Sequence, residues 1–99
     1  MSEPRLTSNV LRVLSEIAGC SLREGASGAD IARNTKLASG TLYPILIRLE
    51  SAGWVDSKWE VGDPSNMGRP RKRFYRITGE GRLQLNSDIA NEIRGLAFP

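Results

Sequence analysis

One amphipathic stretch constrains the fold of this chain more than any other: residues 39–54, SGTLYPILIRLESAGW. Its apolar side chains recur at the three- and four-residue spacing of a helix, at Leu42, Ile45, Leu46 and Leu49. We therefore expect a helix over residues 39–52, and Gly53 suits the left-handed position that ends a helix. The other face carries small polar groups, an aromatic hydroxyl, an apolar residue and a cation: Ser39, Thr41, Tyr43, Ile47 and Arg48. Such a face predicts a helix that can enter a groove.

A shorter helix is expected just before this stretch. Residues 27–30 (SGAD) have the form of a capping box, which satisfies backbone amides at a helix start. They predict a helix over residues 28–34, followed by a turn at residues 36–38. A first helix, capped by Thr7 or Ser8, is expected to run to about residue 18, and residues 20–26 read as a loop. This order of elements predicts a helix-turn-helix.

Pro44 is unusual inside a helix because it has no backbone N–H to donate. If Ser39 is the N-cap, Pro44 lies just past the first turn and one helical hydrogen bond is lost. If Thr41 is the N-cap, Pro44 lies within the first turn at little cost. In both cases the start of the helix is expected to be loosened or bent.

Two strands are expected after this helix. Residues 54–61 and 71–77 are rich in strand formers, and the nine residues between them, GDPSNMGRP, are dense in turn formers. Tyr75 and Ile77 should face one side of the second strand, and Phe74 and Arg76 the other. A hairpin directly after a helix-turn-helix is a wing. The predicted fold class is therefore mainly α with a small β-hairpin, a winged helix-turn-helix over residues 1–77.

The last part of the chain, residues 78–99, predicts a helix that belongs to the same structural unit. Thr78 is expected to cap it. An apolar stripe lies on one face, at Leu85, Ile89, Ile93 and Leu96. The stripe can fold back on the first helix or pack against the same helix of a second subunit. We favour the second arrangement, a homodimer held by this helix, because it would also place two copies of the 39–52 helix symmetrically.

Positive charge is concentrated in the middle of the chain. The net charge is +3, but residues 36–76 hold eight Lys or Arg and four Asp or Glu, a net of +4. Residues 69–76, RPRKRFYR, hold five cations and no acid. Such a concentration is typical of a surface that binds a phosphate backbone.

Composition argues against several other classes of protein. The chain has no histidine and one cysteine, Cys20, which argues against zinc sites and against catalytic Ser-His-Asp or Cys-His groups. Neither GxGxxG nor GxxxxGK[ST] occurs, so we expect no enzyme, cofactor or metal. Because no apolar run approaches the roughly 20 residues of a membrane span, and no export signal is seen, we expect a cytoplasmic protein. Cys20 is expected to be a small buried residue rather than a redox sensor.

Several short motifs together resemble the PadR-type transcriptional regulators. They are GTLYP at 40–44, RLE at 48–50, Gly53, GRPRK at 68–72, YRIT at 75–78 and Gly81. The resemblance covers residues 10–83 and includes Pro44. It implies a dimeric DNA-binding regulator, usually a repressor, whose 39–52 helix enters the major groove while the wing approaches the backbone or minor groove. The chain lacks a long C-terminal domain and resembles the short subgroup, which dimerises through one terminal helix.

Candidate DNA-binding residues follow from these expectations. At the start of the 39–52 helix, Ser39, Gly40 and Thr41 could hold a phosphate, reach base edges or simply cap the helix. Tyr43 could bond a phosphate or be purely structural, and Lys36 in the turn is a candidate phosphate contact. Arg48 could contact DNA or pair with Glu50 or Asp56.

The wing offers four cations as DNA contacts: Arg69, Arg71, Lys72 and Arg73. Arg69 is the candidate for minor-groove insertion, because Gly68 and Pro70 are expected to hold an extended tip. The alternative is a solvated cationic face.

Two tryptophans leave a further alternative open. Trp54 and Trp59 could line a pocket for a small aromatic effector between subunits, or, as we favour, pack the wing strands.

The leading functional hypothesis is a homodimeric repressor of a pseudo-palindromic operator in double-stranded DNA. The alternative is a winged-helix module that docks on a protein, because fold alone does not decide between these uses.

Overall fold

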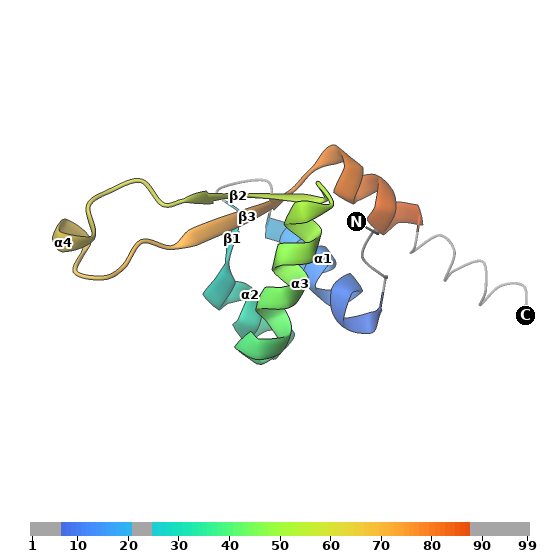
Figure 1. Ribbon diagram of the computed structural model, residues 1–99, viewed down its shortest axis with the longest axis horizontal. Helices are drawn as coiled ribbons and strands as arrows, with labels where there is room; N and C mark the ends of the chain where they lie inside the picture. Colours follow the sequence, from blue (N-terminus) through green and yellow to red (C-terminus); the bar gives the residue numbers. More distant parts are fainter. Residues whose placement is uncertain (1–6, 21–24, 88–99) are drawn as a thin grey trace, which may run out of the picture.

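A computed structural model describes residues 7–20 and 25–87 of the chain. The elements are α1 (Ser8–Cys20), β1 (Ala26–Ser27), α2 (Gly28–Thr35), α3 (Ser39–Ser51), β2 (Val55–Trp59), α4 (Pro64–Met67) and β3 (Arg73–Ile77), and residues 79–87 are helical. In Figure 1, α1, α2 and α3 gather below the base of the β2–β3 hairpin, which projects away from them to α4 at its far end. The predicted fold class, a mainly helical winged helix-turn-helix, is confirmed. In this part of the chain, no helix is long and apolar enough to cross a membrane.

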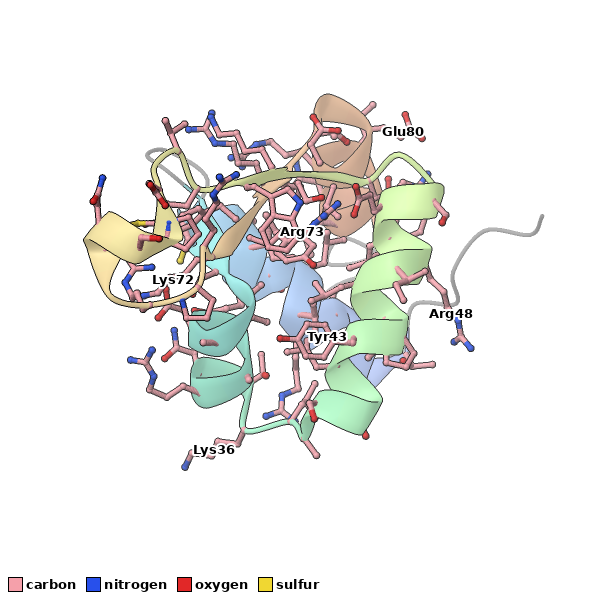
Figure 2. All side chains as sticks on the ribbon, turned by 60° about the vertical axis from the view of Figure 1, so that its left-hand side comes forward. Lys36, Tyr43, Arg48, Lys72, Arg73 and Glu80 are labelled. Carbon is pink, nitrogen blue, oxygen red and sulfur yellow. The ribbon has the colours of Figure 1, made fainter. Side chains whose placement is uncertain are left out.

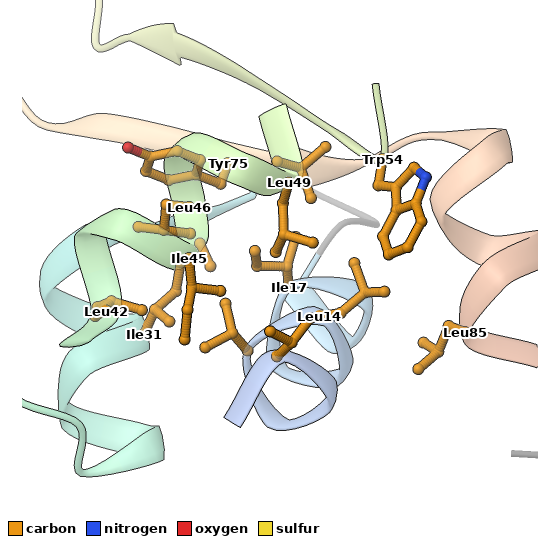
Figure 3. Close-up of a cluster of buried hydrophobic side chains, with 14 residues drawn as sticks. Leu14, Ile17, Ile31, Leu42, Ile45, Leu46, Leu49, Trp54, Tyr75 and Leu85 are labelled. Atoms are coloured by element: carbon orange, nitrogen blue, oxygen red, sulfur yellow. The ribbon is translucent and has the colours of Figure 1, made fainter. Parts of the chain in front are cut away.

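The core joins α1, α2 and α3 to the sheet (Figure 3). The buried stripe of α3 is the predicted one, Leu42, Ile45, Leu46 and Leu49. It packs in one cluster with residues of the other elements, including Leu14, Ile17, Ile31, Trp54 and Tyr75. Burying one such side chain stabilises the fold by about 1.5–3 kcal/mol. Because these four apolar side chains point inward, the rotation of α3 about its axis is fixed, and so is the face it presents to solvent.

A third strand, β1, was not expected. β3 lies in the centre of the sheet and pairs antiparallel with both β1 and β2. The sequence predicts a loop over residues 20–26, but Ala26 lies opposite Tyr75 in the sheet. Gly25 makes this approach possible: its φ is +98°, and a Cβ on it would lie 2.5 Å from the Tyr75 carbonyl oxygen. A strand of two residues has no periodicity of its own, so the sequence carried no signal for it.

The ends of α2 and α3 confirm some capping predictions and correct one. Ser27 caps α2, since its Oγ accepts a hydrogen bond from the Asp30 N–H at 3.1 Å. Gly53, with φ +79°, ends α3 as predicted. The N-cap of α3 is Ala38, which has no side-chain capping bond, so the prediction of Ser39 or Thr41 as cap was wrong. Pro44 consequently lies inside the helix, beyond its first turn.

The start of the last helical segment is tied to the end of α3. Thr78 caps residues 79–87 as predicted, because its Oγ1 accepts the Gly81 N–H at 3.0 Å and donates to the Gly53 carbonyl at 2.6 Å. Gly81 lies so close to Trp54 that a Cβ on it would be 2.1 Å from the Trp54 carbonyl oxygen. The helical segment therefore packs directly on the turn between α3 and β2.

Leu85 corrects part of the dimerisation prediction. Its side chain is only 6% exposed and belongs to the core of its own chain. For this residue the fold-back arrangement holds, because the segment packs against the core rather than offering Leu85 to a partner. The other three members of the predicted stripe, Ile89, Ile93 and Leu96, lie outside the described residues.

The wing ends in one helical turn, α4, where a loop was expected. Asp63 caps it by accepting the Ser65 N–H at 2.9 Å. Pro64 occupies the first turn, where its missing N–H is harmless, and Gly68 ends the turn with φ +70°. The turn formers that predicted a loop are thus the residues that start and stop this short helix.

Candidate nucleic-acid interface

The exposed face of α3 has a middle line and two flanks. The burial of Leu42, Ile45, Leu46 and Leu49 turns the opposite side outward. Along the middle of that side lie Gly40, Pro44, Ile47 and Ser51, all exposed. Tyr43 lies on one flank and points toward α2, whereas Arg48 projects from the other flank into solvent (Figure 2).

The tip of α3 is open to solvent. Ser39, Gly40 and Thr41 are all exposed. The first hydrogen bonds of the helix are those from the N–H groups of Thr41 and Leu42 to the Ala38 carbonyl, each 2.9 Å. Because Ser39 and Gly40 precede these bonds, their N–H groups have no acceptor within the helix. Lys36, in the turn before the tip, is exposed and adopts a left-handed φ of 60°.

Tyr43 is positioned by Gly28. A Cβ on Gly28 would lie 3.0 Å from the Tyr43 hydroxyl oxygen, so the ring rests against the start of α2 where that residue has no side chain. The tyrosine still exposes 46% of its surface. The ring therefore packs on the domain and the hydroxyl is held at a defined place on the surface, while the phosphate contact of Tyr43 stays a prediction.

A cleft of about 290 Å³ opens between the wing, the start of α2 and Tyr43. It is lined by Ser27, Gly28, Ala29, Tyr43, Trp59, Arg71, Lys72, Arg73 and Tyr75. Three of these residues are cations, and none is acidic. The field of Lys72 reaches α2, where it adds to the larger effect of the Ser27 hydrogen bond in lowering the pKa of Asp30. A cleft with cations, hydroxyls and no carboxylate in its lining suits an anion.

The four wing cations occupy different environments. Arg71 and Lys72 are exposed. Arg73 is held within the chain: its Nε donates to Ser57 Oγ at 2.9 Å, its Nη2 lies 3.5 Å from Glu50 Oε2, and its guanidinium stacks 5.1 Å from the centre of the Trp59 ring. Ser57 also donates to Glu50 Oε2, at 2.8 Å. Arg73 therefore fastens the wing to the end of α3, a role that the run of cations did not reveal.

Arg69 is paired with Glu60, and the predicted extended tip is not formed. Arg69 Nη1 and Nη2 donate to the two carboxylate oxygens of Glu60 at 2.6 and 3.0 Å. Glu60 also accepts the Lys72 N–H at 3.3 Å. The bonds from Arg69 hold the pKa of Glu60 at about 2, below its ordinary 4.5. The tip itself is α4, and Arg69 closes the loop that carries it.

Two further alternatives concern the partner of Arg48 and the role of the two tryptophans. Because Glu50 is bonded to Ser57 and Arg73, it is not the partner suggested for Arg48. Trp54 is 2% exposed and lies in the core, so it does not line a pocket with Trp59. Trp59 is 56% exposed and borders the cleft. Packing, the alternative we favoured, is correct for Trp54.

The sequence placed Ile47 on the groove-facing side of the helix, but it was not among the candidate DNA contacts. In the structure it is 65% exposed in the middle line of α3. In the described part of the chain, no group of three or more potential metal ligands comes together.

A helix-turn-helix followed by a basic hairpin beside its second helix defines a winged helix-turn-helix protein. The sequence matches the model of the transcriptional regulator PadR-like family over residues 10–87, and the chain belongs to this family. No curated protein sequence matches the chain.

Solved structures of the same family resemble this fold. A PadR family transcriptional regulator from Eggerthella lenta is 32% identical, with a TM-score of 0.65 over 89% of this chain and 73% of that one. A PadR family regulator from Clostridium difficile is 23% identical, with a TM-score of 0.69 over 92% of both chains. Bacillus subtilis PadR, solved in complex with operator DNA, is 20% identical, with a TM-score of 0.66 over 84% of this chain and 48% of that one.

Proposed function

We propose that this protein is a sequence-specific DNA-binding transcriptional regulator that acts as a homodimeric repressor. In this proposal α3 enters the major groove, and the wing, residues 62–73, lies on the backbone or in the minor groove. One observation carries the proposal: the cleft that joins Tyr43 of α3 to Arg71 and Lys72 of the wing has no acidic residue in its lining. The operator complex of Bacillus subtilis PadR supports the same use of the fold.

The candidate residues divide into three groups. The first group binds phosphates and fixes the position of the protein on the duplex. It consists of Lys36, Tyr43, Arg71, Lys72 and the α3 tip of Ser39, Gly40 and Thr41. Arg48, on the other flank of α3, contacts DNA as a separate cation. Arg73 and Arg69 contribute mainly by holding the wing in place, because both are bonded to carboxylates of their own chain.

We assign dimerisation to the sequence after residue 87, where a helix is predicted. Leu85 is left out of the proposed contact stripe because it is 6% exposed and lies in the core of its own chain. Ile89, Ile93 and Leu96 remain the proposed contact stripe. A two-fold dimer places two copies of α3 about one helical turn apart on DNA, roughly 34–36 Å, which predicts a pseudo-palindromic operator.

Selection of bound duplexes from a random pool tests the proposal. An enriched site with two related halves would support sequence-specific binding by a dimer. A pool that stays unenriched would overturn it and favour the alternative, a module that docks on a protein.

A salt titration on the selected duplex tests the assignment of the cleft. Each phosphate contact contributes about −0.9 to the slope of log affinity against log salt. The double variant Arg71→Ala/Lys72→Ala should therefore flatten the slope by nearly two. Lys58→Ala is the matched control: Lys58 alternates with Ser57 and Trp59 along β2 and faces away from the cleft, so its removal should leave the slope unchanged.

A further inference from the structure

The middle line of the exposed α3 face is almost without polar side chains. Gly40, Pro44, Ile47 and Ser51 follow one another at steps of four, three and four residues, so they lie one above another on the helix. Only Ser51, at the end, has a hydroxyl. The other hydrogen-bonding side chains of this face lie on the flanks, at Tyr43, Thr41 and Arg48.

This line serves no purpose inside the protein. The core contacts of α3 come from the opposite side of the helix. Nothing lies within 4 Å of the place where a Gly40 side chain would begin, and Ile47 is 65% exposed. Pro44 lies beyond the first turn of α3, where proline is the poorest residue, and an exposed isoleucine gains nothing from solvent. The alignment of Pro44 and Ile47 on one outward line, with the open Gly40 before them, therefore points to a partner that lies against α3.

The chemistry of the line restricts what it can meet. The major groove presents hydrogen-bond donors and acceptors on every base pair and one apolar group, the C5-methyl of thymine. Pro44 and Ile47 offer no donor or acceptor to a base edge. Helical side chains lean toward the N-terminus, so Ile47 lies over Pro44 and the two form one apolar patch. At the same time, Gly40 allows the backbone of α3 to approach the bases closely.

We propose that Ile47, supported by Pro44, reads the C5-methyl of a thymine at the centre of each operator half-site. This inference rests on the proposed function and adds a specificity-determining residue to it. The α3 tip and Arg48 then contact the DNA on either side of this apolar patch.

Deoxyuridine scanning of the selected operator tests the inference, because it removes one methyl and keeps base pairing and charge. At one thymine in each half-site, the wild-type protein should bind the deoxyuridine duplex about fourfold more weakly, the size expected for one methyl lost from apolar contact. Ile47→Ala should bind the thymine operator more weakly and should no longer distinguish thymine from deoxyuridine at that position.

Two controls separate this contact from general effects. Leu83→Ala removes an equally exposed aliphatic side chain outside α3 and should keep full sensitivity to the methyl. Arg48→Ala should lower affinity for both duplexes equally. Full discrimination retained by Ile47→Ala would overturn the inference while DNA binding stands. A random pool that yields no operator would instead overturn the proposed function.

Discussion

Glu60 and Arg69 close the wing through two hydrogen bonds, 2.6 Å between Nη1 and Oε1 and 3.0 Å between Nη2 and Oε2. The pair joins Glu60, one residue after β2, to Arg69, two residues after α4. Because the carboxylate already neutralises the guanidinium, Arg69 can bind a phosphate only by exchanging one anion for another. The pair therefore holds the shape of the wing and limits its net charge at once.

Removing the charge of Glu60 should make the wing bind DNA more strongly. In Glu60→Gln, Arg69 becomes available to a phosphate, so affinity at low salt should rise and the slope of log affinity against log salt should steepen by about 0.9. Asp56→Asn removes one negative charge from the exposed side of β2, the strand that ends just before Glu60, and serves as the control. The same slope in Glu60→Gln and the wild type would show that Arg69 does not reach DNA.

The wing pair should also persist in acid well below the ordinary range of a carboxylate. The folded pKa of Glu60 is about 2, lower than its ordinary 4.5. A lowered folded pKa gives a stabilisation that is present above pH 4.5 and is lost as the pH falls through about 2. Carboxyl NMR should accordingly show Glu60 titrating near pH 2, and Arg69→Ala should return its midpoint toward 4.5. A midpoint near 4.5 in the wild type would mean that the pair does not form in solution.

Gly40→Ala should weaken DNA binding without lowering the stability of the fold. No atom lies within 4 Å of the new Cβ, so the variant should fold with equal or greater stability, up to about 1 kcal/mol. Operator binding should weaken, because the methyl group holds α3 away from the bases. Gly19→Ala in α1 meets equally open space and should raise the melting temperature without changing DNA binding. If Gly40→Ala binds as the wild type does, close approach at this residue is excluded.

Leu85 and Ile89 should respond differently to substitution although they share a predicted stripe. Leu85→Ala opens a space in the core and should lower the free energy of unfolding by about 2–5 kcal/mol, measured by urea denaturation. Ile89→Asp should instead convert dimers to monomers in sedimentation while each chain stays folded. Sedimentation of Ile89→Asp as an intact dimer would remove this residue from the interface.

The sequence was informative where a signal is local. Three local predictions were correct. The hydroxyls of Ser27 and Thr78 each accept a backbone N–H three residues further along the chain, and Gly53 ends α3 through its own backbone conformation. The N-cap Ala38 escaped because it forms no side-chain bond that a sequence pattern could reveal. The spacing of Leu85 and Ile89 fixes a shared helix face but not what each residue packs against.

Contacts between distant residues account for the rest. β1 exists because Ala26 lies beside Tyr75, 49 positions away. The run RPRKR predicted a basic wing, but only the fold shows that Arg69 meets Glu60 and that Arg73 meets Glu50. Which cations remain available to DNA is therefore a property of strand register rather than of composition.

The bonds among Glu50, Ser57 and Arg73 should make DNA binding sensitive to the shape of the duplex. They join the last turn of α3 to both strands of the wing, so the helix and the hairpin keep a fixed separation. A duplex whose grooves do not match that separation has to bend or twist in order to bind. The stiffness of base steps that the protein never touches would then contribute to affinity, as indirect readout.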